Sequence, residues 1–288
     1  MKSSDGYFEG VGSLRLYYRA WELPRARAAI AIVHGLGEHG GRYEPIAHRL
    51  SAYGFSTFAM DLRGHGLSDG RRGHIRRFGA YLQDLDRFRR ELFGLVDVGT
   101  PLFLLGHSMG GLIALRYLEE FDTPFRGGII VSPWLATATP VPRWKATLAR
   151  TFNRVLPACP FDSGIDPALL SRDPAIVHTY RDDPLVHSRI TPRLFSEAST
   201  AMGLALQRSD RIRVPLMFLL AGDDKIVSTP KSDAFARSLA ARSVTIHVYA
   251  DFFHEVLHEP GGAEAMRDLR DWIASRLARA RPRRDLVG

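Results

Sequence analysis

The sequence has a single cysteine, few lysines and no long apolar segment. Because Cys159 is alone among 288 residues, no disulfide can form within the chain, and a reducing cytosol is the expected compartment. The longest apolar runs, 28–33 and 216–222, are far shorter than the roughly 18 residues that cross a bilayer. Residues 1–6 lack the apolar core of a secretion signal. We therefore expect a cytoplasmic protein without a membrane-spanning segment.

Acidic residues are outnumbered, and the excess of positive charge is concentrated in two segments. The chain has 39 Lys and Arg against 31 Asp and Glu, a net charge of +8 at pH 7. Residues 62–90 carry eight Arg against three Asp, and residues 276–288 carry five Arg against one Asp. Two interpretations stay open: solvated arginines on helix faces and in a tail, or weak docking to an anionic membrane surface. We expect no nucleic-acid partner, and the sequence leaves the oligomeric state open.

Short apolar runs alternate with amphipathic patterns along most of the chain. Uninterrupted apolar strands between helices are typical of an α/β fold with a mostly parallel sheet that helices cover on both faces. The predicted strands are 14–19, 28–33, 55–61, 102–106, 127–131, 216–221 and 244–249, and the predicted helices are 42–53, 78–98, 110–121, 229–241 and 263–281.

One long segment interrupts this alternation. Residues 133–192 hold nine of the 17 prolines and no clear strand. Here and just beyond, the sequence shows only short helical patterns, such as 144–156 and 194–206. A long excursion that stays rich in Leu, Phe, Trp and Val indicates a lid rather than a linker. We therefore predict a helical cap at 135–206, inserted between sheet strands of a core formed by 1–134 and 207–288. Within that core, 276–288 is a basic tail that need not be ordered.

A candidate nucleophile lies where a predicted strand passes directly into a helix. Gly106-His-Ser-Met-Gly110 has the G-x-S-x-G pattern of a nucleophile elbow, in the strand-turn-helix context that this motif requires. Gly106 and Gly110 suit the crowding of such a sharp turn, which leaves Ser108 on a strained backbone with its hydroxyl above the sheet. A serine hydroxyl also needs a base and a carboxylate that orients the base.

Both groups follow later predicted strands, but each has a neighbour of the same type. Asp223 and Asp224 come directly after the strand 216–221, and composition alone does not separate them. His254 and His258 follow the strand 244–249. Sites in open α/β sheets lie at the carboxyl ends of strands, so these positions favour a triad with Ser108.

The two histidines also raise a metal alternative. Residues 254–258 read H-E-x-x-H, which is a zinc-protease signature when it lies on a helix. Pro260 and two glycines follow at once, and no further histidine occurs that could be the third ligand. We therefore expect neither a metal nor a cofactor.

An oxyanion hole is predicted from two backbone N–H groups. Residues 34–37, His-Gly-Leu-Gly, follow the strand 28–33, and their glycines would let the Leu36 N–H point at a developing oxyanion. The residue after the nucleophile, Met109, supplies the second N–H in this fold.

With these motifs the chain resembles the α/β-hydrolases, and within them the monoacylglycerol lipases and related lysophospholipases of the bacterial type. The similarity runs from about residue 8 to about residue 275. The segments that carry it are His34-Gly-Leu-Gly-Glu-His-Gly-Gly-Arg-Tyr43, Asp61-Leu-Arg-Gly-His-Gly-Leu-Ser-Asp-Gly70, Gly106-His-Ser-Met-Gly-Gly111, Ser171-Arg-Asp-Pro174 and Tyr180-Arg-Asp-Asp-Pro-Leu-Val-His187.

The resemblance implies roles for particular residues. Asp224, ahead of Lys225 and two apolar residues, matches the family's acid, and His254, between an aromatic residue and Glu255, matches its base. Leu36 and Met109 match the oxyanion donors. The resemblance also implies that Glu38, Arg42 and Tyr180 lie near the polar, glycerol-facing end of the pocket.

The predicted activity is hydrolysis of the ester bond of a monoacylglycerol, or a similar single-chain lipid, to fatty acid and alcohol through an acyl-enzyme. A lysophospholipase, a general carboxylesterase or a proline-releasing peptidase on the same triad stays open as the alternative. Such an enzyme would meet its substrate at the membrane periphery. Candidates for the apolar wall of the pocket are Trp134, Trp144, Leu148, Phe152, Phe195 and Met202.

Overall fold

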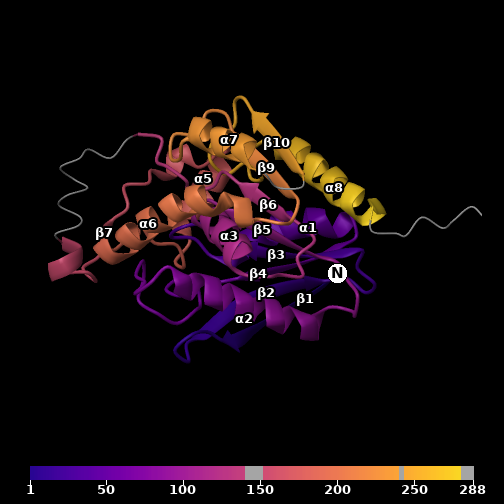
Figure 1. The fold of residues 1–288 in the computed structure, drawn as a ribbon, viewed down its shortest axis with the longest axis horizontal. Helices are drawn as coiled ribbons and strands as arrows, with labels where there is room; N and C mark the ends of the chain where they lie inside the picture. The colour runs from indigo at the N-terminus through magenta and orange to yellow at the C-terminus, as the bar shows by residue number, and fades with distance from the viewer. Residues whose placement is uncertain (140–151, 240–242, 280–288) are drawn as a thin grey trace, which may run out of the picture.

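The centre of the molecule is an eight-stranded sheet (Figure 1). A computed structural model describes residues 1–139, 152–239 and 243–279. The strand order is β1-β2-β4-β3-β5-β6-β9-β10; β2 pairs antiparallel with β1 and β4, and the other neighbours are parallel. This mostly parallel sheet confirms the predicted fold class. The bounds are Lys2–Glu9 (β1), Arg15–Glu22 (β2), Ala28–Val33 (β3), Phe55–Met60 (β4), Leu102–His107 (β5), Gly128–Val131 (β6), Leu216–Ala221 (β9) and Val244–Tyr249 (β10).

Helices cover the two faces of the sheet and create two apolar cores. Alternate residues of β3 enter different cores: Ala29 and Val33 pack with α2, α3, α6 and α7, whereas Ile30 and Ile32 pack with α1 and α8. Strands buried on both faces favour continuous apolar sequence, and β3, β5 and β9 were predictable for this reason; β4 is equally buried but contains Ser56 and Thr57. The bounds are Glu44–Ala52 (α1), Gly79–Leu95 (α2), Met109–Glu120 (α3), Pro192–Arg208 (α6), Thr229–Ser238 (α7) and Gly262–Arg279 (α8).

The chain between β6 and β9 forms the inserted segment. It contains the helix α5, Pro174–Asp182, and two antiparallel strands of two residues each, Phe161–Asp162 (β7) and Arg189–Ile190 (β8), where the sequence indicated no strand. Residues 152–155 are helical, and the rest of the helix predicted at 144–156 lies outside the described residues. α6 contacts α3, so this helix of the predicted cap also covers the sheet. The division at 135 and 206 stays a prediction. Short 3-10 helices lie at Gly40–Tyr43 (η1), Pro167–Leu169 (η2) and Ser209–Arg211 (η3).

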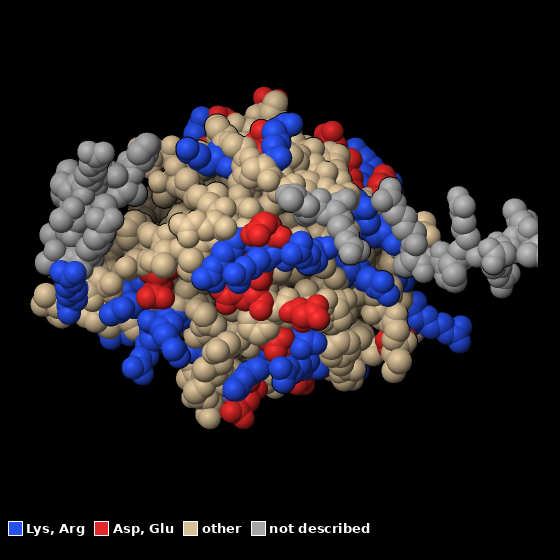
Figure 2. Space-filling model, viewed as in Figure 1, with Lys and Arg blue, Asp and Glu red and all other residues tan. Residues whose placement is uncertain are grey.

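Many arginines of the basic segment 62–90 have acidic partners. Arg63 pairs with Asp84, and Arg89 and Arg90 both pair with Asp86. Figure 2 shows basic and acidic side chains next to one another over the middle of one face. Asp84 and Asp86 belong to the same segment, so these pairs leave its surplus of five Arg over Asp in place. Of the helices that the structure describes, none is long and apolar enough to cross a membrane. Residues 280–288 of the predicted tail lie outside the described part of the chain.

Candidate active site

Ser108 lies at the turn between β5 and α3, on a strained backbone. Its φ of 53° and ψ of −117° belong to a conformation that residues with a side chain rarely adopt. The turn is so tight that a Cβ on Gly106 would lie 2.3 Å from the Gly110 carbonyl oxygen, and one on Gly110 would lie 2.0 Å from that of Val33. The glycines of the motif are therefore required by sterics, as the sequence predicted.

Asp224 and His254 are brought together from two loops at the carboxyl ends of β9 and β10. His254 Nδ1–H donates to Asp224 Oδ2 at 2.7 Å, and Asp224 Oδ1 accepts from the backbone N–H groups of Ile226 and Val227 at 2.8 and 2.9 Å. Burial opposes ionisation, but His254 and the two N–H groups outweigh it and lower the pKa of Asp224. An ionised Asp224 can only accept, which leaves Nε2 of a neutral His254 free to take a proton.

The neighbours of these two residues serve other purposes. Asp223 is about half exposed, and it pairs with Lys225 at the surface. His258 Nε2–H donates to the Arg42 carbonyl oxygen at 3.1 Å, and its Nδ1 lies 3.2 Å from Glu255. The two imidazoles of the H-E-x-x-H pattern therefore have different partners, and residues 254–258 form no helix. No group of His, Cys, Asp and Glu within the described residues could hold a metal ion.

The predicted oxyanion loop lies directly beside Ser108. A Cβ on Gly35 would lie 3.2 Å from the Cβ of Ser108. His34 Nδ1–H donates to the Gly35 carbonyl at 2.7 Å, and because C=O and N–H of a trans peptide point in opposite directions, the Leu36 N–H points away from His34. Within the described residues, the Leu36 N–H donates a hydrogen bond to no acceptor. Met109 is the first residue of α3, so its N–H lacks a helical acceptor as well.

Glu38 connects the oxyanion loop to the elbow. Its Oε1 accepts from the Gly35 N–H at 2.6 Å, from Tyr43 Oη–H at 3.1 Å and from His107 Nδ1–H at 3.2 Å. The centre of the His107 ring lies 4.8 Å from that of His254. Burial would raise the pKa of Glu38, but His107 and Arg42 hold it well below its usual value. Conversely, burial would lower the pKa of His107, but the bond to Glu38 raises it.

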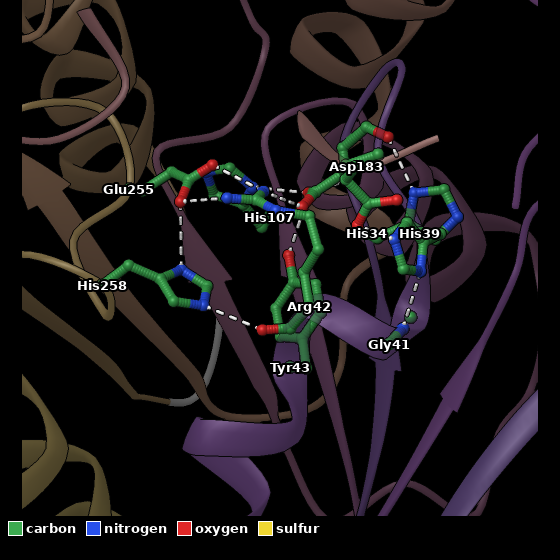
Figure 3. Close-up of polar contacts among 12 residues, drawn as sticks. His34, His39, Gly41, Arg42, Tyr43, His107, Asp183, Glu255 and His258 are labelled. Carbon is green, nitrogen blue, oxygen red and sulfur yellow. Dashed lines mark hydrogen bonds and ion pairs between the residues drawn. The ribbon is translucent and has the colours of Figure 1, made fainter. Parts of the chain in front are cut away.

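Arg42 extends this buried network to the residue after His254 (Figure 3). Its guanidinium donates to Glu38 at 2.6 Å and, through both terminal nitrogens, to the two carboxylate oxygens of Glu255 at 2.7 and 2.9 Å. Burial would lower the pKa of Arg42, but Glu255 and Glu38 raise it. The three segments that carry Leu36, Ser108 and His254 are therefore linked by one chain of hydrogen-bonded ionisable side chains: His107, Glu38, Arg42 and Glu255.

The predicted glycerol-facing residues lie in or against this network. The Tyr180 ring stacks on Arg42, with 4.7 Å between the guanidinium carbon and the ring centre. Glu38, Arg42 and Tyr180 are not among the residues that line the pocket at Ser108. Both carboxylate oxygens of Glu38 already accept hydrogen bonds. A direct contact of these three residues with substrate stays a prediction.

A pocket of about 330 Å³ opens at Ser108. Leu36 lines it together with Trp134, Ile190, Phe195 and other residues of the inserted segment, and with residues of the loop after β9. Trp134 and Phe195 thus lie where an acyl wall was predicted. Phe152 is exposed, Met202 packs against the core, and the other two candidates, Trp144 and Leu148, lie outside the described residues.

Comparisons with known proteins find relatives over most of the chain. The family model described as serine aminopeptidase, S33, matches residues 24–261. A monoacylglycerol lipase of Mycolicibacterium smegmatis is 31% identical to this chain, over 95% of the chain and 98% of the lipase. A phospholipase of Bacillus subtilis is 28% identical, over 87% of this chain and 96% of its own.

The solved structures include a near match. The crystal structure of a monoacylglycerol lipase from Paleococcus ferrophilus is 34% identical, with a TM-score of 0.82, and the match covers 91% of this chain and 99% of the other. The match of the family model extends from before β3 through the loop that carries His254, so it includes every segment of the site described above. The chain therefore belongs to the serine aminopeptidase S33 family of α/β-hydrolases.

Proposed function

We propose that this chain is a serine hydrolase that cleaves the ester bond of monoacylglycerols to a fatty acid and glycerol. The observation that carries the proposal is the buried His254–Asp224 hydrogen bond beside the elbow whose Ser108 lines the pocket. A nucleophile, a base and an orienting carboxylate are the groups that acyl transfer requires. They come from three strand ends that are distant in sequence, so chance proximity is a poor explanation.

Each residue has a definite part in the proposed mechanism. Ser108 Oγ attacks the ester carbonyl while His254 Nε2 takes the hydroxyl proton, and the charge that forms on the carbonyl oxygen is stabilised by the Leu36 and Met109 N–H groups. Collapse of this intermediate breaks the ester bond, and His254 gives its proton to the leaving glycerol oxygen. Water then attacks the acyl-enzyme with His254 as base, which releases the fatty acid and restores Ser108. These steps involve no cofactor.

The pocket suits a single acyl chain. Its volume of about 330 Å³ is near the lower end of the roughly 300–1,000 Å³ that is usual for ligand sites. Trp134, Ile190 and Phe195 give it apolar walls. Its charged lining residues are Asp166 and Lys225, and Lys225 is paired with Asp223. Of two relatives with similar lengths, one is named monoacylglycerol lipase and the other monoglyceride lipase, which supports a neutral glycerol head group.

A substrate panel tests this assignment. The panel compares monoacylglycerols of increasing chain length with the glycerol ester of acetic acid. We expect kcat/KM for medium and long chains to be at least about tenfold higher than for the acetyl ester, because each buried methylene adds apolar binding energy. Lysophosphatidylcholine of matched chain length and a proline anilide complete the panel. Preference for the phosphocholine head group would favour a lysophospholipase, and preference for the acetyl ester or the anilide would reject the lipase assignment.

We also propose that the inserted segment contacts anionic lipid surfaces. Large apolar side chains between residues 152 and 161 are exposed, and one of them, Phe161, lines the pocket. The exposed Arg154 and Arg189 lie in the same segment. Arg189 lies opposite Asp162 in the register of the strands β7 and β8. Exposed apolar groups beside cations suit a lipid surface. The exposed apolar residues are Phe152 (41%), Val155 (71%), Leu156 (50%) and Phe161 (45%).

Vesicle binding tests this surface. We expect Val155→Ser to lower the partition coefficient onto phosphatidylglycerol-containing vesicles by about threefold to tenfold, because a valine that enters lipid is replaced by a polar group. Val98→Ser is the matched control, since Val98 is fully exposed but lies before the amino end of β5, whereas the pocket is at Ser108, after the carboxyl end of the same strand. Equal losses in both variants, or none in either, would reject the contact.

A further inference from the structure

The inserted segment touches the oxyanion loop at its tip. The His187 N–H donates to the Gly37 carbonyl oxygen at 2.9 Å, with Gly37 at a φ of +80°. The two backbones are so close that a Cβ on Gly37 would lie 2.3 Å from the His187 carbonyl oxygen. On its other side, His187 Nε2–H donates to the Gly64 carbonyl at 3.2 Å. The segment 180–187 therefore lies between the oxyanion loop and the turn after β4.

A second contact fixes the residue that ends the loop. His39 Nε2–H donates to Asp183 Oδ2 at 2.7 Å, and His39 Nδ1 accepts from the Gly41 N–H at 3.1 Å, which caps η1 (Figure 3). Because Nδ1 accepts, the hydrogen of the neutral ring must be on Nε2, which is the tautomer that Asp183 needs. The Leu185 N–H donates to the other Asp183 oxygen at 2.8 Å.

These bonds leave Asp183 as an ionised acceptor in a partly buried position. Burial opposes ionisation, but the hydrogen bonds from His39 and Leu185 outweigh it and lower the pKa of Asp183. A hydrogen bond to an ionised carboxylate is roughly twice as strong as one between neutral groups. The bond from His39 to Asp183 is therefore stronger than the backbone bond from His187 to Gly37, which also joins the loop tip to the inserted segment.

The first residues of the oxyanion loop are held differently from its tip. The Gly35 carbonyl accepts from His34 and the Gly35 N–H donates to Glu38, so both groups are bound within residues 34–38. At the tip, Gly37 and His39 are bound by residues about 150 positions later in the chain. The Leu36 N–H lies between these two attachments, and its position depends on both.

We propose that Asp183 is a positioning residue: by holding His39, it keeps the oxyanion loop in the geometry that directs the Leu36 N–H at the reacting carbonyl. This role rests on the proposed hydrolase function. A misplacement of about 1 Å in such a site can cost on the order of 100-fold in rate, even when the altered residue is remote from the chemistry. Correct seating of the inserted segment is thus a condition for transition-state stabilisation as well as for substrate binding.

Kinetics of Asp183→Ala test the role. We expect kcat on a medium-chain monoacylglycerol to fall by about 10-fold to 30-fold with KM changed less than about threefold, because the loss is in the transition state. Affinity for a trifluoromethyl ketone of the same chain length, whose adduct with Ser108 carries an oxyanion, should fall by a similar factor. Affinity for the fatty acid product, which forms no adduct, should stay within about twofold.

Asp182→Ala is the matched control, because Asp182 is adjacent and exposed and its ion pair is with His178 at the surface. It should retain wild-type kcat. His39→Asn is a second variant, which tests the same bond from the other side even if Asp183→Ala does not fold. Asn can still cap η1, but it is too short to reach Asp183. The two changes should be strongly non-additive when combined, since each alone breaks the same bond.

Labelling by a fluorophosphonate separates failure of this proposal from failure of the proposed function. If the wild type is not labelled at Ser108, the hydrolase function and the positioning role are both rejected. If the wild type is labelled and both Asp183→Ala and His39→Asn keep its kcat and its affinity for the ketone, the positioning role alone is rejected. Slower labelling of both variants, together with wild-type labelling of Asp182→Ala, would support it.

Discussion

Replacing Ser108 with alanine is expected to lower kcat/KM for ester hydrolysis by about 10⁴-fold to 10⁶-fold. The change removes one oxygen, which the proposed mechanism uses as the nucleophile in every turnover. It leaves the pocket and the His254–Asp224 bond in place. Because Ser108 is only half-buried, the melting temperature should stay within about 3 °C of the wild type. Initial rates and thermal unfolding of the same preparations give both quantities.

Ser132 offers a matched control for this variant. It also has a positive φ, 39°, at the end of the neighbouring strand β6, and its hydroxyl is buried without a partner in the described part of the chain. Ser132→Ala thus repeats the same chemical change on a similar backbone, and its activity should stay within about threefold of wild type. A Ser108→Ala protein that is folded and retains more than about 1% of wild-type activity would contradict a Ser108 nucleophile.

Local sequence patterns were sufficient for the elements that are buried. The strands β3, β5 and β9 are buried at every position, and each reads as a continuous apolar run. β1 was missed because it is an edge strand in which most residues are exposed or half-buried, so few are apolar. α5 was missed because none of its residues is buried, although Asp173 and Pro174 at its start are a recognisable cap and first turn.

The site was predictable to the extent that its residues lie in short motifs. The elbow around Ser108 and the strand ends before Asp224 and His254 could be identified from local patterns. The choice of Asp224 and His254 over their neighbours came from the resemblance to the family's motifs. The pairing of Glu38 with Arg42 has a helical i, i+4 spacing that sequence can indicate. The partner that completes the network, Glu255, is 213 residues from Arg42, and no local pattern predicts such a contact.

Asp224→Asn is expected to lower kcat by about 10³-fold to 10⁴-fold, whereas Asp223→Asn should stay within about twofold of wild type. Asp224 uses one oxygen for His254 and the other for the N–H groups of Ile226 and Val227. An amide has only one oxygen, so its NH₂ group must face either His254 or the two backbone donors. If the amide oxygen stays on the backbone, the NH₂ group forces His254 Nδ1 to accept, and Nε2 then carries the hydrogen and cannot act as base.

The adjacent aspartates make this comparison a stringent test. The Asp223 side chain is about half exposed and pairs with Lys225 at the surface, and such an ion pair contributes little to stability in water. The same substitution is thus made at two neighbouring positions, of which only Asp224 is buried and bonded to His254 and to the Ile226 and Val227 N–H groups. Because a buried unpaired amide also costs stability, the pH dependence is the decisive readout: Asp224→Asn should recover activity as hydroxide rises, since its loss is one of base catalysis. Equal losses at both positions, or a loss at Asp224 that follows the fraction of unfolded protein, would show that Asp224 does not orient a catalytic imidazole.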